Sequence, residues 1–376
     1  MATRRVLFAL LAVCLLLAVM PVSFADSHAR IVRLSDLQGD VQIDRNTGHG
    51  LERAIMNMPI TQGVRLETGP SGRAEVEFEN GSALRLAENT SVEFSDLTLR
   101  SNGDRATGFR VNNGTAYVNF KRKNGDDFRL DAGNQAITLD HDVHFRLLLS
   151  GNDAQIAVFK GELQVPHNGE MSKVKKDETL NLNLNDSSQF ALAKGVSGFG
   201  ADEWDSQRTD YNTQYAANYN RNQYPYQFGY SDLTYYGGFF NAPGYGTLWR
   251  PFGVNSMWDP YGDGAWAYYP GAGYTWVSAY PWGWMPYRYG RWVFVPAYGW
   301  SWQPGGWNTW NAYPVYVNAP STWHRPVPPP VASAGRPTVI VGHPVFNRPM
   351  HPVPGGAAFA GGRPNRGMPQ TASQNP

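Results

Sequence analysis

The sequence predicts an all-β protein: an antiparallel β-sandwich or β-roll domain, one linking helix, aromatic β-hairpin repeats and a disordered C-terminal tail. Three observations lead to this fold class. Apolar and polar residues alternate with a period of two through the first half of the chain, Asn-Gly dipeptides separate the alternating runs, and an aromatic pattern recurs after 26 residues in the second half.

The first 25 residues have the three zones of a secretory signal. Arg4 and Arg5 precede an apolar run over 6–19, and the small-residue site over 23–25 follows. The run is shorter than the roughly 20 residues that cross a bilayer. We therefore expect cleavage after Ala25 and a periplasmic or secreted protein with no transmembrane span in its mature chain.

Composition limits the chemistry that the mature chain can carry. The single cysteine, Cys14, lies inside the predicted signal, so we expect no disulfide and no thiolate site. Without Arg4 and Arg5 the chain has 30 basic and 31 acidic residues, so no net field favours nucleic acid as a partner.

Residues 29–195 are predicted to form the β domain. Ala74, Val76 and Phe78 alternate with charged residues, as a half-buried strand requires, and similar runs follow. Five turn dipeptides separate the runs, at 80–81, 102–103, 113–114, 124–125 and 168–169. Because Asn-Gly supplies the positive φ of tight hairpins, we expect consecutive strands to pair as antiparallel neighbours.

A helix is predicted over 200–222, between the two modules. Trp204, Arg208, Tyr211, Tyr215 and Tyr219 recur at helical spacing, and acidic residues begin the segment, as the helix dipole favours. We expect the aromatic stripe to dock against the rest of the molecule.

Residues 235–324 contain the aromatic repeats. All 13 tryptophans lie between Trp204 and Trp323. The stretch 264–276 matches 290–302 at seven positions, and a fainter copy lies 27 residues upstream, around Phe239 and Trp249. Each copy is predicted to be a hairpin with a Pro-Gly turn. The hairpins must pack on one another or on the first module, because a single hairpin is marginal in water.

The tail, 325–376, is rich in proline and glycine, with Pro328-Pro329-Pro330 near its start. Such a composition cannot bury enough apolar surface to offset the entropy of ordering. We predict that this segment is flexible.

Five segments of the first module carry a family resemblance. They are 39–43 (GDVQI), 60–69 (ITQGVRLETG), 72–82 (GRAEVEFENGS), 111–118 (VNNGTAYV) and 158–165 (VFKGELQV). In this order they resemble the FecR periplasmic domain over about 135 residues. The resemblance implies a β-rich extracytoplasmic module, which in the iron-uptake regulators receives a signal from an outer-membrane receptor.

The sequence departs from those regulators in two ways. They carry a cytosolic anti-sigma segment and a membrane helix before the domain, where this chain has the predicted signal. The family usually has a Gly-Thr before a phenylalanine, and this chain has LDHDVHF at 139–145 instead. The stretches 273–278 and 281–292 are similar to a set of bacterial envelope proteins in which a tryptophan-rich region follows a FecR-like domain, which supports the two-module architecture.

Two groups of residues offer chemistry that we consider less favoured. Asp259 and Asp263 flank Tyr261 and form a conceivable glycosidase pair, although polar turn residues are the plainer account. Asp140, His141, Asp142 and His144 are metal-ligand types, but on a strand at most three of them share a face. We predict no enzyme, no metal and no cofactor.

The aromatic repeats are the main candidate for ligand binding. Flat rings on a sheet face can stack on sugars or bind quaternary ammonium groups. The eight candidate rings are Trp266, Tyr268, Tyr274, Trp276, Trp292, Phe294, Trp300 and Trp302. The same rings can instead form the core of a small lysine-free module, or support adhesive assembly through exposed edges.

The sequence thus predicts a non-enzymatic envelope protein that acts as a protein-interaction or sensory module. Its partner would be an envelope protein or a second copy of the chain. The alternative function is binding of cell-wall glycan or exopolysaccharide through the aromatic repeats.

Overall fold

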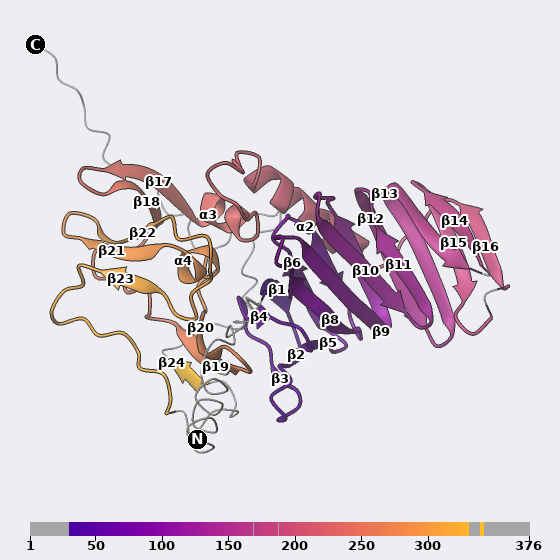
Figure 1. Cartoon of the computed structure of the whole chain (residues 1–376), viewed down its shortest axis with the longest axis horizontal. Coiled ribbons are helices and arrows are strands. Elements are labelled where there is room, and N and C mark those ends of the chain that lie inside the picture. The colour runs from indigo at the N-terminus through magenta and orange to yellow at the C-terminus, as the bar shows by residue number, and fades with distance from the viewer. Residues whose placement is uncertain (1–29, 168, 187, 331–338, 342–376) are drawn as a thin grey trace, which may run out of the picture.

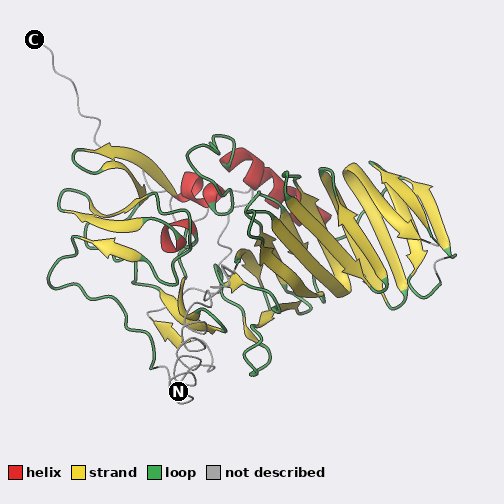
Figure 2. Ribbon diagram, in the orientation of Figure 1, coloured by secondary structure: helices red, strands yellow, loops and turns green. Residues whose placement is uncertain are grey.

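A computed structural model describes residues 30–167, 169–186, 188–330 and 339–341. The predicted signal over 1–25 and most of the predicted tail lie outside these residues. Within the described part, strands dominate and helices are few (Figure 2). The predicted all-β class is confirmed.

The β domain consists of strands β1 to β16. Their bounds are β1 Val32–Gln38, β2 Val41–Asp44, β3 Glu52–Arg53, β4 Pro59–Ile60, β5 Arg65–Thr68, β6 Arg73–Glu77, β7 Ala83–Leu86, β8 Ser91–Leu99, β9 Arg105–Phe120, β10 Asp126–Ala132, β11 Gln135–Leu139, β12 Val143–Ser150, β13 Asp153–His167, β14 Glu170–Lys175, β15 Glu178–Asn183 and β16 Phe190–Lys194. The main path runs β16-β15-β13-β12-β9-β7-β6-β1-β4, and the remaining strands branch from it.

Two long strands each take part in two sets of strand pairs. The first half of β9 pairs with β8 and β10, and its second half pairs with β7 and β12. Strand β13 pairs with β12 and β15 and then, beyond Gly161, with β14. Gly114 in β9 and Gly161 in β13 lie where each strand changes its partner strands, and they have φ of 89° and 78°. A Cβ at Gly161 would lie 2.3 Å from the carbonyl oxygen of Asp142, so glycine is required there.

The hairpin prediction was wrong at two of the five Asn-Gly dipeptides. Asn113 and Gly114 lie inside β9, where the positive φ bends a continuous strand instead of reversing it. The turn at Gly125 leads into β10, which pairs with β9 in parallel because the chain first crosses back to the start of β9. The dipeptide fixes the local φ but does not determine which strand comes next.

The β domain is filled by aliphatic side chains and a few phenylalanines, which we call the aliphatic core. Val32, Leu84, Val118, Phe145 and Ile156 are examples, each at most 2% exposed. Edge-on contacts between phenylalanines supplement it, with the rings of Phe78 and Phe128 4.9 Å apart. Alternation along the strands therefore marked the inner face correctly.

Three helices are described, where one was predicted. The linking helix is α2, Asp202–Tyr215, so Tyr219 lies beyond its end. Two short helices, α3 (Tyr230–Tyr236) and α4 (Met285–Arg288), were not predicted. None of the described helices is long and apolar enough to span a membrane.

The three predicted repeats form three hairpins. They are β17–β18 (Gly237–Ala242, Gly246–Pro251), β19–β20 (Gly264–Tyr269, Gly273–Ser278) and β21–β22 (Arg291–Val295, Gly299–Gln303). Gly246, Gly273 and Gly299 hold equivalent turn positions with φ between 73° and 76°. Strands β17, β18, β22 and β21, with β23 (Val315–Val317), form a five-stranded sheet beside the β domain (Figure 1).

A short part of the predicted tail is a strand. Residues 325–330 have no regular structure, whereas β24 (Val339–Val341) pairs with the outer edge of β19. This pairing was not predicted, because the proline-rich composition around it conceals three consecutive β-branched residues.

Candidate functional site

The predicted ligand-binding rings face inward for the most part. Trp266, Trp276, Trp292, Trp300 and Trp302 are at most 3% exposed, and Tyr268, Tyr274 and Phe294 are half-buried. The expected cross-strand partners do face each other, as in the pair Trp266 with Trp276, whose rings are 5.2 Å apart. The strand geometry was therefore predicted correctly.

These five tryptophans belong to a cluster of buried rings that we call the aromatic core. It also contains Trp249, Trp284, Tyr261, Tyr287 and Tyr289. A sugar cannot stack on a ring that is buried inside the module. In this arrangement the five tryptophans stabilise the module, and ligand binding stays a prediction for the three half-buried rings only.

The hairpin β19–β20 belongs to both cores. Its Trp266 and Trp276 side lies in the aromatic core, and Ala265, Ala267 and Val277 on the opposite face pack into the aliphatic core. Because successive residues of a strand point to opposite faces, one hairpin fills both layers. The two modules are thereby joined by continuous packing.

Arg288 is the most deeply buried cation of the aromatic module. It is fully buried at the end of α4, and its guanidinium donates to the backbone carbonyl oxygens of Trp276 (2.5 Å), Asn311 (3.2 Å) and Ala312 (3.3 Å). Burial lowers the pKa of Arg288 to about 10. The residue holds the edge of β20 against the segment that follows the last hairpin.

Two glutamates of a buried row, Glu75 and Glu77, join the β domain to α2 and α3. Glu75, Glu77 and Glu79 point away from the aliphatic core, and each is at most 6% exposed. Glu75 accepts from Arg85 and Arg208, each at 2.6 Å, and Arg208 belongs to α2. Burial raises the pKa of the Glu75 carboxyl, but the two arginines outweigh burial and hold it well below its usual range.

Arg33 connects the β domain to α3 in this interface. It lies directly opposite Glu77 on the neighbouring strand and forms ion pairs with both Glu77 and Asp232 of α3. It also donates to the carbonyl oxygen of Pro281 (3.2 Å). Burial raises the pKa of Glu77 despite Arg33.

The sequence analysis missed this charged interface. The alternation around Val76 indicated that Glu75 and Glu77 form one face of a strand, which usually is the solvent face. Arg208, the partner of Glu75, lies 133 residues further along the chain, and Asp232, which shares Arg33 with Glu77, lies further still. The polar face showed no signal that a second module covers it.

The residues of the two alternative chemistries are engaged elsewhere. The side chain of Asp259 accepts the backbone N–H of Tyr261 (2.8 Å), as a turn residue does. His144 lies 2.7 Å from Asp205 of α2, and Asp142 accepts the backbone N–H of Arg122. Among the described residues no group of three or more metal-ligand side chains gathers.

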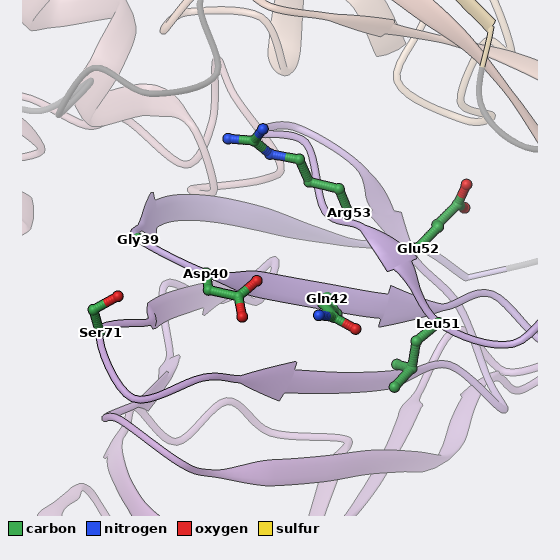
Figure 3. Close-up of a pocket in the computed structure, with 7 residues that line it drawn as sticks. All are labelled: Gly39, Asp40, Gln42, Leu51, Glu52, Arg53 and Ser71. Atoms are coloured by element: carbon green, nitrogen blue, oxygen red, sulfur yellow. The ribbon is translucent and has the colours of Figure 1, made fainter.

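A hollow of about 610 Å³ lies beside β2 and β3 (Figure 3). Its lining residues are Gly39, Asp40, Gln42, Leu51, Glu52, Arg53 and Ser71. Asp40, Glu52 and Arg53 do not converge on a common point in Figure 3, and Glu52 forms an ion pair with Arg45. The hollow therefore presents no focused binding group.

The strongest candidate site is the free edge of β16, which we call the distal edge. Strand β16 is at the end of the β domain farthest from the aromatic module (Figure 1) and, among the described strands, pairs only with β15. Phe190 and Leu192 are 46% and 47% exposed there. An exposed apolar edge strand is a template for pairing with another chain.

The fold defines an all-β protein of two modules. Comparison with known families agrees with this division. Residues 64–164 match the FecR protein family, and residues 230–329 match a family of unknown function, DUF6600. The chain carries a FecR domain followed by a DUF6600 region, as the resemblance predicted.

Among solved structures, the chain is similar to a putative anti-sigma factor from Parabacteroides distasonis ATCC 8503. The identity is 13%, the TM-score 0.31, and the match covers 37% of this chain and 63% of that one. A second structure with the same description matches at 13% identity and a TM-score of 0.30, over 35% and 59%. The match thus spans less than two thirds of those chains. No curated protein matches the sequence.

Proposed function

We propose that this chain is a non-enzymatic envelope protein that acts as a protein-interaction or sensory module. The observation that carries the proposal is the exposed apolar edge of β16 at the end of the β domain, whose residues 64–164 match the FecR family. The shared hairpin and the charged interface tie the two modules together at the other end of the β domain.

The proposal includes export. The signal predicted over 1–25, with cleavage after Ala25, would deliver the chain to the periplasm or the medium. Fractionation of the native host, with mass determination of the mature N-terminus, tests this part. An intact N-terminus in the cytosolic fraction would contradict it.

Glycan binding is not favoured as a second function. Its main candidates, Trp266 and Trp292, are at most 1% exposed and form part of the aromatic core. The half-buried rings Tyr268 and Tyr274 pack edge-on against each other, with centroids 5.5 Å apart. A sugar platform requires an accessible ring face.

Photocrosslinking in intact cells tests the interaction function. A benzophenone amino acid replaces Leu192 on the distal edge, and in a matched chain it replaces Ser206, an exposed residue of α2. We expect covalent adducts with protein at position 192 and few at position 206.

The chain should cross-link at position 192 in the native host, at its natural expression level. A chain that forms no adduct at 192, or as many at 206 as at 192, would refute an interaction function of the distal edge. Mass spectrometry of the adducts then identifies the occupant.

A further inference from the structure

The backbone of β16 presents alternate residues to solvent. Gln189 O accepts the N–H of Asn183 (3.0 Å), and the N–H of Gly195 donates to Asp177 O (2.6 Å). In an antiparallel pair these hydrogen-bonded positions alternate with positions that point away from the partner. The N–H and C=O groups of Phe190, Leu192 and Lys194 therefore point to the free edge.

The same three residues share one face of the strand. In the register with β15, Phe190 and Leu192 lie opposite Leu182 and Leu180, which are at most 5% exposed in the aliphatic core. The ring of Phe190 also stacks on His167, with centroids 3.9 Å apart. The core face thus continues to the edge of the sheet and is uncovered at β16.

The opposite end of the sheet cannot serve as a partner for this edge. Strand β4 ends the path at the other side, and both of its residues, Pro59 and Ile60, are buried. Copies of the chain therefore cannot pair head to tail from β16 to β4, the two ends of the main path. Two copies that pair through β16 itself, around a twofold axis, form a closed assembly.

We propose that the distal edge pairs with the β16 edge of a second copy, antiparallel and centred on Leu192, to form a sheet continuous across the dimer. This inference rests on the proposed function and names the partner. In this register Leu192 faces its own counterpart, and Phe190 faces Lys194 of the other copy. All three outward residues then exchange backbone hydrogen bonds, and no donor of the edge stays unpaired.

Charge favours the same register. Lys194 is the only ionisable residue of β16, and the twofold axis places the two lysines at opposite ends of the joint, beside the aromatic rings of the other copy. A lysine over a phenylalanine ring is attracted by the ring quadrupole. The lysines thus contact rings instead of each other, whereas a charge introduced at Leu192 would meet its own copy.

The oligomeric state of the full chain tests the proposal. We expect sedimentation analysis to show a dimer whose population rises with protein concentration. Its dissociation constant should be below about 100 µM but not tight, since small interfaces associate weakly. Leu192→Lys should weaken dimerisation at least tenfold. Met171→Lys on β14 is the matched control, because Met171 is 61% exposed and its substitution should leave the dimer unchanged. A monomeric wild type, or a Leu192→Lys chain that dimerises like wild type, would overturn the proposal.

A cysteine at the axis tests the register in the native host. The only cysteine in the sequence is Cys14, within the predicted signal. Leu192→Cys should form a disulfide-linked dimer, because directly opposed Cα atoms of a hydrogen-bonded pair are about 5.5 Å apart, within disulfide range. Ala191→Cys, whose side chain lies on the other face, should cross-link far less.

The two proposals fail in different ways. Photocrosslinks from position 192 to other envelope proteins, without self-adducts or a disulfide dimer, would keep the interaction function and reject the second copy as partner. An absence of all adducts at 192 would reject both. Circular dichroism of each variant shows whether its fold is retained.

Discussion

The two modules fill their interiors with different kinds of side chain. The β domain buries aliphatic residues on one face of its sheet and arginine–glutamate pairs on the other, whereas the repeat module fills its interior with indole and phenol rings. An aliphatic core needs many strands to enclose it. Large rings let three short hairpins bury enough surface to persist, provided that they share a hairpin with the larger module.

The aromatic residues and the distal edge differ in role. The tryptophans, which are conspicuous in the sequence, are mostly internal and structural. The surface that we propose for a partner is on the module with ordinary composition, at Phe190 and Leu192.

The largest loss of stability is expected from removing a ring of the aromatic core. Trp292 is fully buried and its ring lies 5.4 Å from that of Trp258 and 5.6 Å from that of Tyr287. Trp292→Ala should lower the free energy of unfolding by about 3–5 kcal/mol, as in other large-to-small core substitutions. Denaturant unfolding measures the change.

Phe294→Ala is the matched control for this prediction. Phe294 lies on the same strand, β21, and is only half-buried. Phe294→Ala should lower the free energy of unfolding by less than half as much as Trp292→Ala. Equal losses for the two substitutions would mean that the rings do not form a core.

The second-largest effect concerns the charged interface. Glu75→Gln leaves Arg208 without its carboxylate partner and should cost about 3 kcal/mol, because a buried charge remains unpaired. Glu77→Gln should cost less: burial raises the pKa of Glu77, and Arg33 keeps its ion pair with Asp232. Thermal unfolding at neutral pH ranks the two variants, and the reverse order would contradict this account.

Acid should act through the same carboxyl group. The pKa of Glu75 is lower in the folded chain than in the unfolded chain, so its stabilisation is complete above the unfolded value of about 4.3 and is lost as the pH falls toward the folded value. We expect the free energy of unfolding to decrease below about pH 4, and to decrease less steeply in Glu75→Gln. Identical slopes would argue against the pairing.

Arg288→Lys should have an intermediate effect of about 2 kcal/mol. An ammonium group cannot reach three carbonyl oxygens with the fixed fork of a guanidinium, so at least one charge-assisted hydrogen bond is lost. Urea titration quantifies the loss. A substitution without effect would show that the carbonyl contacts contribute little.

The smallest effect is expected at the half-buried rings. Tyr274→Ala should change stability by about 1 kcal/mol or less, since one partly exposed edge-on ring contact is removed. The same variant tests the glycan alternative by pelleting with purified cell-wall material. We expect no difference from wild type, and a clear loss of retention would restore a ligand-binding role for this surface.

Local features of the fold were predictable from the sequence. The hairpins followed from aromatic residues at every second position and from glycines that accept positive φ, such as Gly273 and Gly299. The helix around Trp204 followed from spacing and acidic residues at its start. These signals act over a few residues and need no knowledge of distant partners.

Features that depend on long-range contact were not predictable. Glu75 and Glu77 have the spacing of a solvent face. Only the folded chain brings Arg208 to Glu75, and Asp232 to the Arg33 that pairs with Glu77. Whether a ring such as Trp266 faces solvent or other rings depends in the same way on what packs above it. The short run from Phe190 to Lys194 became notable only once its strand proved to be the last of the sheet.

Hydrogen exchange of the full chain tests the central claim most directly, because it reports on both regions at once. We expect the amides of β19 to β22 to exchange as slowly as those of β9 and β12. At low protein concentration the outward amides of Phe190 and Leu192 should exchange quickly, and they should slow as the concentration rises. Fast exchange throughout the aromatic hairpins, together with a β16 edge that is equally protected at every concentration, would contradict the account.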